Sequence, residues 1–162
     1  MSTVAPLQLR EFYVDKLVVE TNADYSDDHD EARSDDRDME ITANVAKHPD
    51  KLDFMVTLGV SCTPKSVSAG TRFTRLEATI RGFFSLPDDT TQEVVDQLVP
   101  YNCFAIVYGL LRGAVAQATG MTVHGVQVLP TVNLLAALSG DDGGPEVTDA
   151  ADSTNSPDDH DQ

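Results

Sequence analysis

Residues 52–62 read LDFMVTLGVSC, and this stretch decides the fold because every second side chain in it is apolar. A period of two is typical of a β-strand with one buried face, since successive side chains of a strand point to opposite sides of the sheet. The turn formers His48, Pro49 and Asp50 come before it. The stretch therefore predicts a strand whose buried face carries Leu52, Phe54, Val56, Leu58, Val60 and Cys62.

The same kind of pattern continues on both sides of this strand. Residues 39–46 (MEITANVA) alternate in the same way, and residues 76–86 (LEATIRGFFSL) begin with apolar and charged side chains on opposite faces. Residues 7–20 (LQLREFYVDKLVVE) are rich in β-branched and aromatic residues, which favour strands. Because the connections between the later strands are short, we expect four antiparallel strands with one covered and one solvated face.

Helices are predicted after the fourth strand. Residues 90–99 (TTQEVVDQLV) combine an N-cap signal with helical spacing before Pro100 interrupts it. Residues 102–119 are apolar nearly all the way round, so a helix there needs cover on more than one side. The sheet supplies one cover, and a loop or another subunit must supply the other. The small residues Ala105, Gly109 and Gly113, four apart, let another backbone approach, and we take them as oligomer-interface candidates.

The end of the chain completes the expected architecture. Residues 121–131 read as an extended apolar connection, and residues 132–138 (VNLLAAL) predict a short terminal helix. The predicted fold class is α+β, with a four-stranded antiparallel sheet covered on one face by a long apolar helix and a short C-terminal helix.

Charge divides the chain into a body and appendages. The net charge is −16, of which residues 21–38 supply −6 and residues 139–162 supply −8, so the rest is nearly neutral. We therefore expect one domain over residues 1–138, with an acidic loop at 21–38, and a disordered acidic tail at 139–162. Such a molecule repels nucleic acid and anionic lipid but can attract a basic partner.

Several classes of function find no support. Residues 103–115 form the longest apolar run, which is shorter than the roughly 20 residues of a membrane span and contains Arg112. No leader pattern precedes residue 7, so we expect a cytoplasmic protein. Cys62 and Cys103 form no metal-ligand motif, and no nucleophile motif accompanies any histidine. The Asp-rich loop lacks the Gly and terminal Glu of a calcium-binding EF-hand. We expect no catalysis, no metal and no cofactor.

The order of these elements resembles the SecB family of protein-export chaperones over about residues 7–138. Residues 9–20 (LREFYVDKLVVE) resemble the family's first strand, and residues 76–86 resemble its fourth strand with a Gly-aromatic exit. The run Leu129, Pro130, Val132, Asn133 and Leu134 resembles a family signature that ends in an aromatic residue, here replaced by Leu134. The likeness lies in the ordered set.

The resemblance implies a homotetramer, a dimer of dimers, that holds unfolded preproteins in apolar grooves and passes them to the SecA motor without ATP of its own. Exposed aromatics and an open strand edge bind unfolded chains with little demand on sequence. The alternative for each aromatic is a place in the core, above all for Tyr108. The candidates for the client-binding groove are Phe83, Phe84, Leu86, Tyr101, Phe104 and Tyr108.

In the family, acidic residues on the outer sheet face contact SecA. Glu20 and Glu77 match two of these positions, whereas Lys16 stands where the family has a further acid and Arg75 replaces an apolar residue. The alternative for Glu77 is an ordinary solvated strand residue paired with Arg75 or Arg81. The tail is either a ligand for a basic segment of SecA or a solvated charge run.

From the sequence we expect the first of the following three functions, and we keep the other two as alternatives. The first is a holdase that delivers preproteins to SecA for export. The second is a SecB-like chaperone dedicated to one client, such as the antitoxin of a toxin–antitoxin system. The third, from another class, is an acidic interaction protein that mimics nucleic acid. An enzyme on this scaffold has no residues to nominate.

Overall fold

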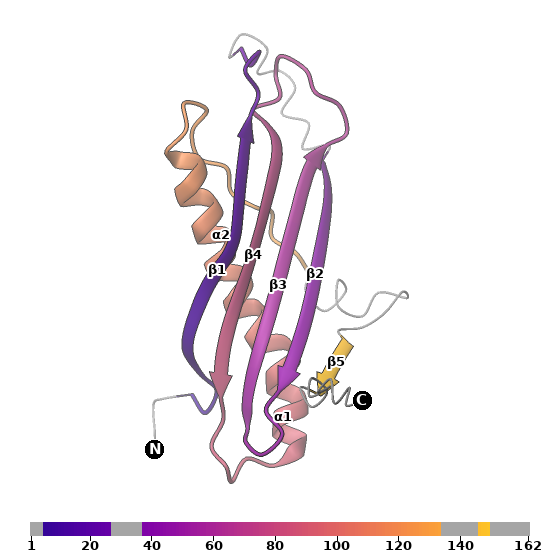
Figure 1. Cartoon of the computed structure of the whole chain (residues 1–162), viewed down its shortest axis with the longest axis vertical. Coiled ribbons are helices and arrows are strands. Elements are labelled where there is room, and N and C mark those ends of the chain that lie inside the picture. The colour runs from indigo at the N-terminus through magenta and orange to yellow at the C-terminus, as the bar shows by residue number, and fades with distance from the viewer. Residues whose placement is uncertain (1–4, 27–36, 134–145, 150–162) are drawn as a thin grey trace, which may run out of the picture.

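The computed structural model describes residues 5–26, 37–133 and 146–149. Four long strands, β1 (Gln8–Thr21), β2 (Arg37–Lys47), β3 (Asp53–Pro64) and β4 (Phe73–Ser85), form an antiparallel sheet in the order β1-β4-β3-β2 (Figure 1). This antiparallel sheet, together with the helices that follow it in the chain, confirms the predicted α+β class. The acidic residues 27–36 of the predicted loop lie outside the described residues.

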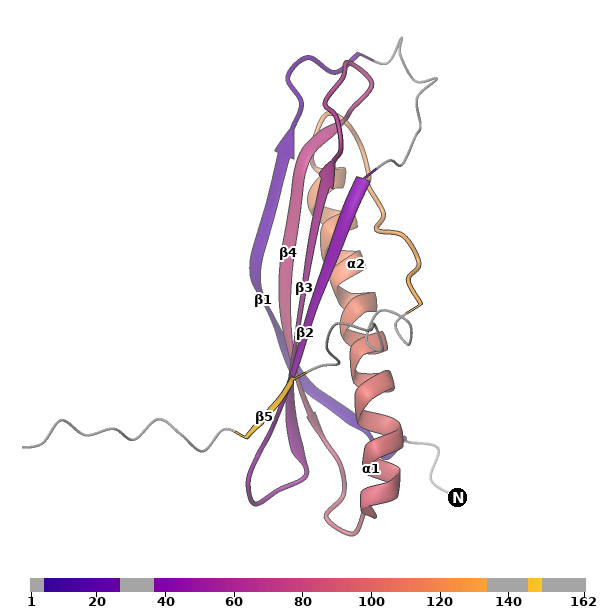
Figure 2. The same cartoon turned by 90° about the vertical axis from the view of Figure 1, so that its right-hand side faces the viewer.

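One long helical layer covers a single face of the sheet, as Figure 2 shows from the side. It consists of α1 (Gln92–Leu98), the π-helical turn η2 (Val99–Cys103) and α2 (Phe104–Gly120). From the sequence we expect Pro100 to interrupt the helix. The structure instead carries it through a π-helical turn with Pro100 in its first turn, where the missing N–H costs little.

The core lies between α2 and the inner face of the sheet. Val56 and Leu58 of β3 and Ile80 of β4 are almost fully buried, in one cluster with Val107 and Leu111 of α2. The alternating residues of the predicted strands thus supply the sheet side of the core. The helix supplies the other side with side chains at spacings of three and four residues.

Gly82 of β4 allows the helix to approach the sheet. A Cβ atom built there would lie 2.8 Å from Cγ2 of Val107 and 2.9 Å from Cε2 of Phe84. These distances are shorter than ordinary van der Waals contact, so any larger side chain at this position must push α2 outward.

An extended segment, residues 121–133, runs back from the end of α2 and is tied to that helix by hydrogen bonds to side chains of α2, among them the 2.8 Å bond that the Gln127 N–H donates to Thr119 Oγ1. Tyr108 Oη donates to the carbonyl oxygen of Pro130 at 2.6 Å, and Arg112 Nε donates to that of Leu129 at 3.0 Å. Leu129 itself is buried. The polar atoms of an otherwise apolar helix are used to hold this connection.

The C-terminal region differs from the expectation in one respect. Residues 139–162 were expected to lack structure, but Glu146–Asp149 form β5, a short strand parallel to β2. Of the predicted helix at 132–138, residues 134–138 lie outside the described residues, and Val132 and Asn133 are not helical. β5 could not be predicted because four residues in an acidic tail are too few to show a recognisable alternation of apolar and polar side chains.

Candidate functional site

The six predicted groove residues do not come together in one groove of the single chain. Phe83 is on the outer sheet face, where its ring meets Tyr13 edge-on with centroids 6.0 Å apart. Tyr101 is exposed in the π-helical turn. The remaining four occupy the core, which is the alternative that the sequence left open, and they are Phe84, Leu86, Phe104 and Tyr108.

A pocket of about 500 Å³ opens at the end of the sheet where β1 begins and β2 ends. Its apolar lining comes mainly from Phe54 and Met55 of β3 and from Phe83 and Phe84 of β4. Lining residues that are charged or belong to the adjoining turn are Arg10, Glu11, Lys47, His48, Pro49 and Asp53. The pocket therefore combines an apolar floor with a polar rim of mixed sign.

Of the large apolar residues that line this pocket, the sequence predicts Phe83 and Phe84 as client contacts but not Met55. The alternation of residues 52–62 puts Met55 on the face that the sequence predicts to be solvated, although methionine is apolar. The register pairs Met55 with Phe83, so both side chains lie on the outer face. Two large apolar residues on a face expected to be solvated are the signal that would have located this pocket.

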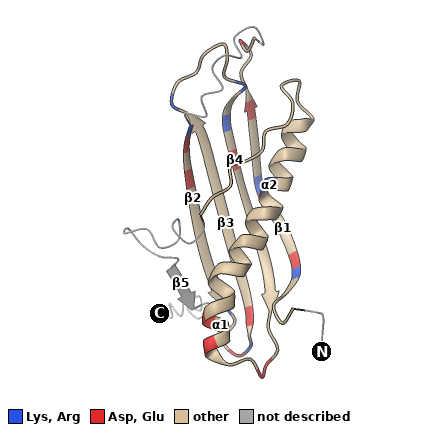
Figure 3. Cartoon of the chain, turned by 180° about the vertical axis from the view of Figure 1, so that it is seen from behind, with Lys and Arg blue, Asp and Glu red and all other residues tan. Residues whose placement is uncertain are grey.

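The outward side of α2 is open in the single chain. Ala105, Gly109 and Gly113 are all exposed, and a Cβ atom added at either glycine would meet none of the described residues within 4 Å apart from the adjoining backbone of its own helix. In Figure 3, the side of α2 away from the sheet is almost free of charged residues. The three oligomer-interface candidates thus form one exposed stripe of small residues on an apolar helix.

Helix length corrects one expectation from the sequence. The continuous helix from residue 92 to residue 120 has 29 residues and is, by length and composition alone, long and apolar enough to cross a membrane. The apolar run 103–115 covers only part of this helix, so it underestimates the helix length. Val107, Leu111 and Val115, however, are buried among the core residues, as in the core helix of a sheet-and-helix domain.

More apolar surface lies beside the helix. In the segment after α2, Met121 and Val123 are 80% and 94% exposed, so the single chain covers almost none of their side chains. Val126 and Val128 follow in the same segment and are also exposed. Along edge strand β1 the exposed apolar side chains are Phe12, Tyr13, Val14 and Leu17.

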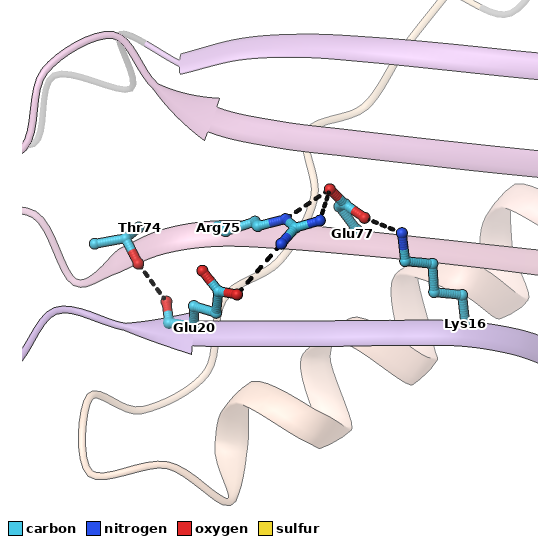
Figure 4. Close-up of polar contacts among 5 residues, drawn as sticks. All are labelled: Lys16, Glu20, Thr74, Arg75 and Glu77. Carbon is cyan, nitrogen blue, oxygen red and sulfur yellow. Dashed lines mark hydrogen bonds and ion pairs between the residues drawn. The ribbon is translucent and has the colours of Figure 1, made fainter.

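The four SecA-contact candidates form one ion-pair network on the outer face (Figure 4). Glu77 forms an ion pair with Lys16 of β1, and Arg75 Nη2 lies 2.6 Å from its Oε1. Arg75 also reaches Glu20, with Nη1 3.4 Å from Oε1. Hydrogen bonds from Lys16 and then Arg75 hold the pKa of the Glu77 carboxyl below its usual value. The proposed pairing of Glu77 with Arg75 is thus present.

A second ion pair on this face is separate from the network. Arg81 of β4 makes two hydrogen bonds to Asp15 of β1, with its Nη2 2.7 Å from Oδ1 and its Nε 2.9 Å from Oδ2. The hydrogen bonds from Arg81 lower the pKa of the Asp15 carboxyl. Arg81 is therefore not the partner of Glu77.

The described residues contain no group of three or more His, Cys, Asp and Glu side chains placed to hold a metal ion. His124 packs edge-on against Tyr25, with ring centroids 4.9 Å apart, and against Phe73 at 6.1 Å. Burial raises the pKa of the Cys103 thiol to about 12, which keeps it protonated and unreactive at neutral pH. These groups serve packing.

Comparison with known proteins identifies the fold. No family model and no curated protein matches this sequence. A solved structure does match: the SecB-like chaperone Rv1957 of Mycobacterium tuberculosis, in complex with a ChAD peptide from the Rv1956 HigA1 antitoxin. The TM-score is 0.55 at 15% sequence identity, and the match covers 78% of this chain and 91% of that one. This chain therefore has the fold of the SecB-like chaperones, as the order of its elements predicted.

Proposed function

We propose that this protein is an ATP-independent holdase chaperone of the cytoplasm, dedicated to a single client such as an antitoxin. The observation that carries the proposal is the SecB-like fold with a large apolar surface left uncovered on its helix and sheet edge. A holdase needs apolar surface and open strand edges, because unfolded clients share apolar side chains and free backbone amides rather than a shape.

The apolar pocket at the end of the sheet offers one part of such a surface. Side chains of a client would pack over Met55 and Phe83, while the charged rim of the pocket would stay in contact with water. The exposed segment around Met121 and Val123 offers another part. An extended client that covered both would exchange exposed apolar area on two molecules for a shared interface, which is favourable at about 25 cal/mol per Å² before the costs of ordering.

The outer face favours a dedicated client over general export. Glu20 and Glu77 already bind Arg75 and Lys16 of the same chain, so a basic partner must compete with these internal cations. The similar solved structure holds a peptide from an antitoxin, which supports this class of client. The second candidate function is delivery of preproteins to SecA. It is supported by Glu20 and Glu77, which match acidic positions of the SecB family by the sequence resemblance.

Self-association belongs to the same proposal. We infer a homotetramer built as a dimer of dimers, in which the stripe of Ala105, Gly109 and Gly113 packs against a second copy. Small residues at four-residue spacing allow helix axes to approach closely. Burial of the exposed helix face would supply the second cover that this apolar helix requires.

The test is suppression of aggregation by the purified full chain, without nucleotide, when a slowly folding protein is diluted from denaturant. The candidate antitoxin is one client and several unrelated preproteins are the others. A dedicated chaperone protects the antitoxin at about one oligomer per client and leaves the others to aggregate. Equal protection of all clients would contradict the dedicated chaperone and favour a general holdase that delivers preproteins for export. Protection of none would reject the holdase and favour the acidic interaction protein.

A further inference from the structure

The edge of β2 opposite β3 is partly occupied by the chain's own tail. Residues 44–47 of β2 pair in parallel with β5, from Asn44 opposite Glu146 to Lys47 opposite Asp149. Both views of the fold show β5 beside the end of β2 (Figures 1 and 2). Among the described residues, the rest of β2, from residue 37 to 43, has no strand on this side.

The tail strand is a weak element that other chains can replace. It is four residues long, against eleven in β2, so it completes only a short ladder. Its sequence, EVTD, has two β-branched residues at its centre, and these suit a strand. An exposed strand edge accepts any extended segment through backbone hydrogen bonds, with little demand on side chains. The edge at 44–47 is thus occupied by a strand that suits it but is held only by a short ladder.

Charge and position connect this edge to the apolar pocket. Lys47 belongs both to the paired part of β2 and to the pocket lining, where Arg10 and His48 are further basic groups. Residues 139–162 contain eight acids and no Lys or Arg. The lining also contains the acids Glu11 and Asp53, so the charge match is local and rests on Lys47, which lies opposite Asp149 in the ladder.

We propose that the β2 edge at residues 44–47 is a docking site for extended polypeptide, and that the tail strand Glu146–Asp149 occupies it in cis until a client strand displaces it. The inference rests on the proposed holdase function and adds a competitor built into the chain. The expected occupant of the docking site is an extended peptide with β-branched residues. This peptide adds a strand to β2, and the side chains that follow the paired residues lie over the pocket.

The first test frees the edge without changing charge. In the full chain, Val147→Pro with Thr148→Pro removes ladder donors from β5, whichever of the two residues faces β2. The probe is a soluble, fluorescent synthetic peptide that alternates threonine and valine. We expect the affinity of the protein for this peptide to rise by about three- to tenfold. The reason is that β5 leaves the edge free in only a fraction of the wild-type molecules. Amide hydrogens of residues 44–47 should also exchange faster.

A matched control and an opposite variant complete the test. Ser153→Pro with Thr154→Pro adds two prolines to the tail outside β5 and should leave the affinity unchanged. Ala46→Cys with Thr148→Cys joins paired positions, whereas Cys62 and Cys103 are buried. Oxidation should lock the tail on the edge and lower peptide affinity by about tenfold or more, and reduction should restore it.

The outcomes separate this inference from the holdase. Wild-type affinity in both the double-proline variant and the oxidised variant would overturn the cis competitor while leaving the chaperone proposal standing. Binding of the peptide by no variant, including the one with a freed edge, would overturn the docking site at residues 44–47, whereas the holdase is judged by its own aggregation test. Unchanged amide exchange at residues 44–47 in the double-proline variant would also overturn the competitor, because it would show that the tail does not cover the edge.

Discussion

Arg75 Nη2 lies 2.6 Å from Oε1 of Glu77, two residues further along β4. Residues two apart in a strand share a face, so the pair lies on the outer side of the sheet. Glu77 also binds Lys16, and Arg75 also reaches Glu20. Two acids that by position could meet a basic partner are thus held by two cations of the same chain, which is the physical reason for favouring a dedicated client.

Arg75→Leu should increase the affinity for SecA. The substitution removes the cation that both acids share and puts an apolar residue where the family resemblance expects one. The folded state should change little, because exposed ion pairs contribute little to stability. The matched control is Arg81→Leu, which removes an outer-face arginine that binds Asp15 instead. Binding to immobilised SecA measures the effect, and equal affinity in wild type and both variants would remove the internal pairs as an explanation.

Gly109→Leu with Gly113→Leu should prevent assembly of the proposed oligomer without unfolding the protomer. Apart from the adjoining backbone of its own helix, an added Cβ at either position meets none of the described residues within 4 Å, so the protomer has room. Leucine also favours the helix over glycine by up to about 1 kcal/mol. Light scattering should show a smaller particle, while circular dichroism shows the same secondary structure.

Gly82→Ala is the informative contrast to this pair. Its Cβ would lie 2.8 Å from Cγ2 of Val107 between the sheet and α2, and such overpacking costs about 1–3 kcal/mol. The protomer should therefore lose stability to urea. If the double leucine variant kept the wild-type mass in solution, the helix stripe would not be an interface.

Met55→Glu should weaken client binding by roughly tenfold or more, because it puts a charge on the pocket floor where burial of an apolar side chain is worth about 1.5–3 kcal/mol. The control is Thr57→Glu, two residues further along β3 on the same outer face and outside the pocket lining. Both variants gain one negative charge. Titration of labelled unfolded client measures both affinities, and equal losses would point to charge rather than to the pocket.

Sequence patterns were reliable where burial alone determines structure. The inner residues of the strands, such as Val56 and Ile80, are buried, because period-two alternation reports a half-buried strand directly. The apolar helix was predicted for the same reason. Pro100 misled the prediction because a π-helical turn tolerates it, and no local pattern announces such a turn.

The site was harder to predict because its residues meet only through strand pairing. Met55 and Phe83 are 28 positions apart and become neighbours by register. An aromatic residue also has the same sequence appearance in a core as in a groove, so Phe84 and Phe104 could not be distinguished from surface aromatics before their burial was known.

The Asp15–Arg81 pair predicts the acid dependence of stability. The pKa of Asp15 is lowered below its ordinary value of 3.8 in the folded protein by hydrogen bonds from Arg81. A carboxyl whose folded pKa is depressed stabilises the protein above its unfolded pKa, and this stabilisation is lost as pH falls through the folded pKa. Asp15→Asn should therefore lower the urea midpoint slightly at neutral pH, and the gap to wild type should close only as the pH falls from the unfolded pKa of about 4 through the lower folded pKa.

The comparison needs a carboxyl without this arginine. Asp89→Asn, in the exposed connection after β4, changes the charge equally and should leave the urea midpoint close to wild type at each pH. Because Asp15 and Arg81 are partly exposed, added salt should shrink the difference at neutral pH. A gap between Asp15→Asn and wild type that stayed constant from neutral pH down to acid would mean that the side chain acts through packing, and that its ionised form has no special role in the fold.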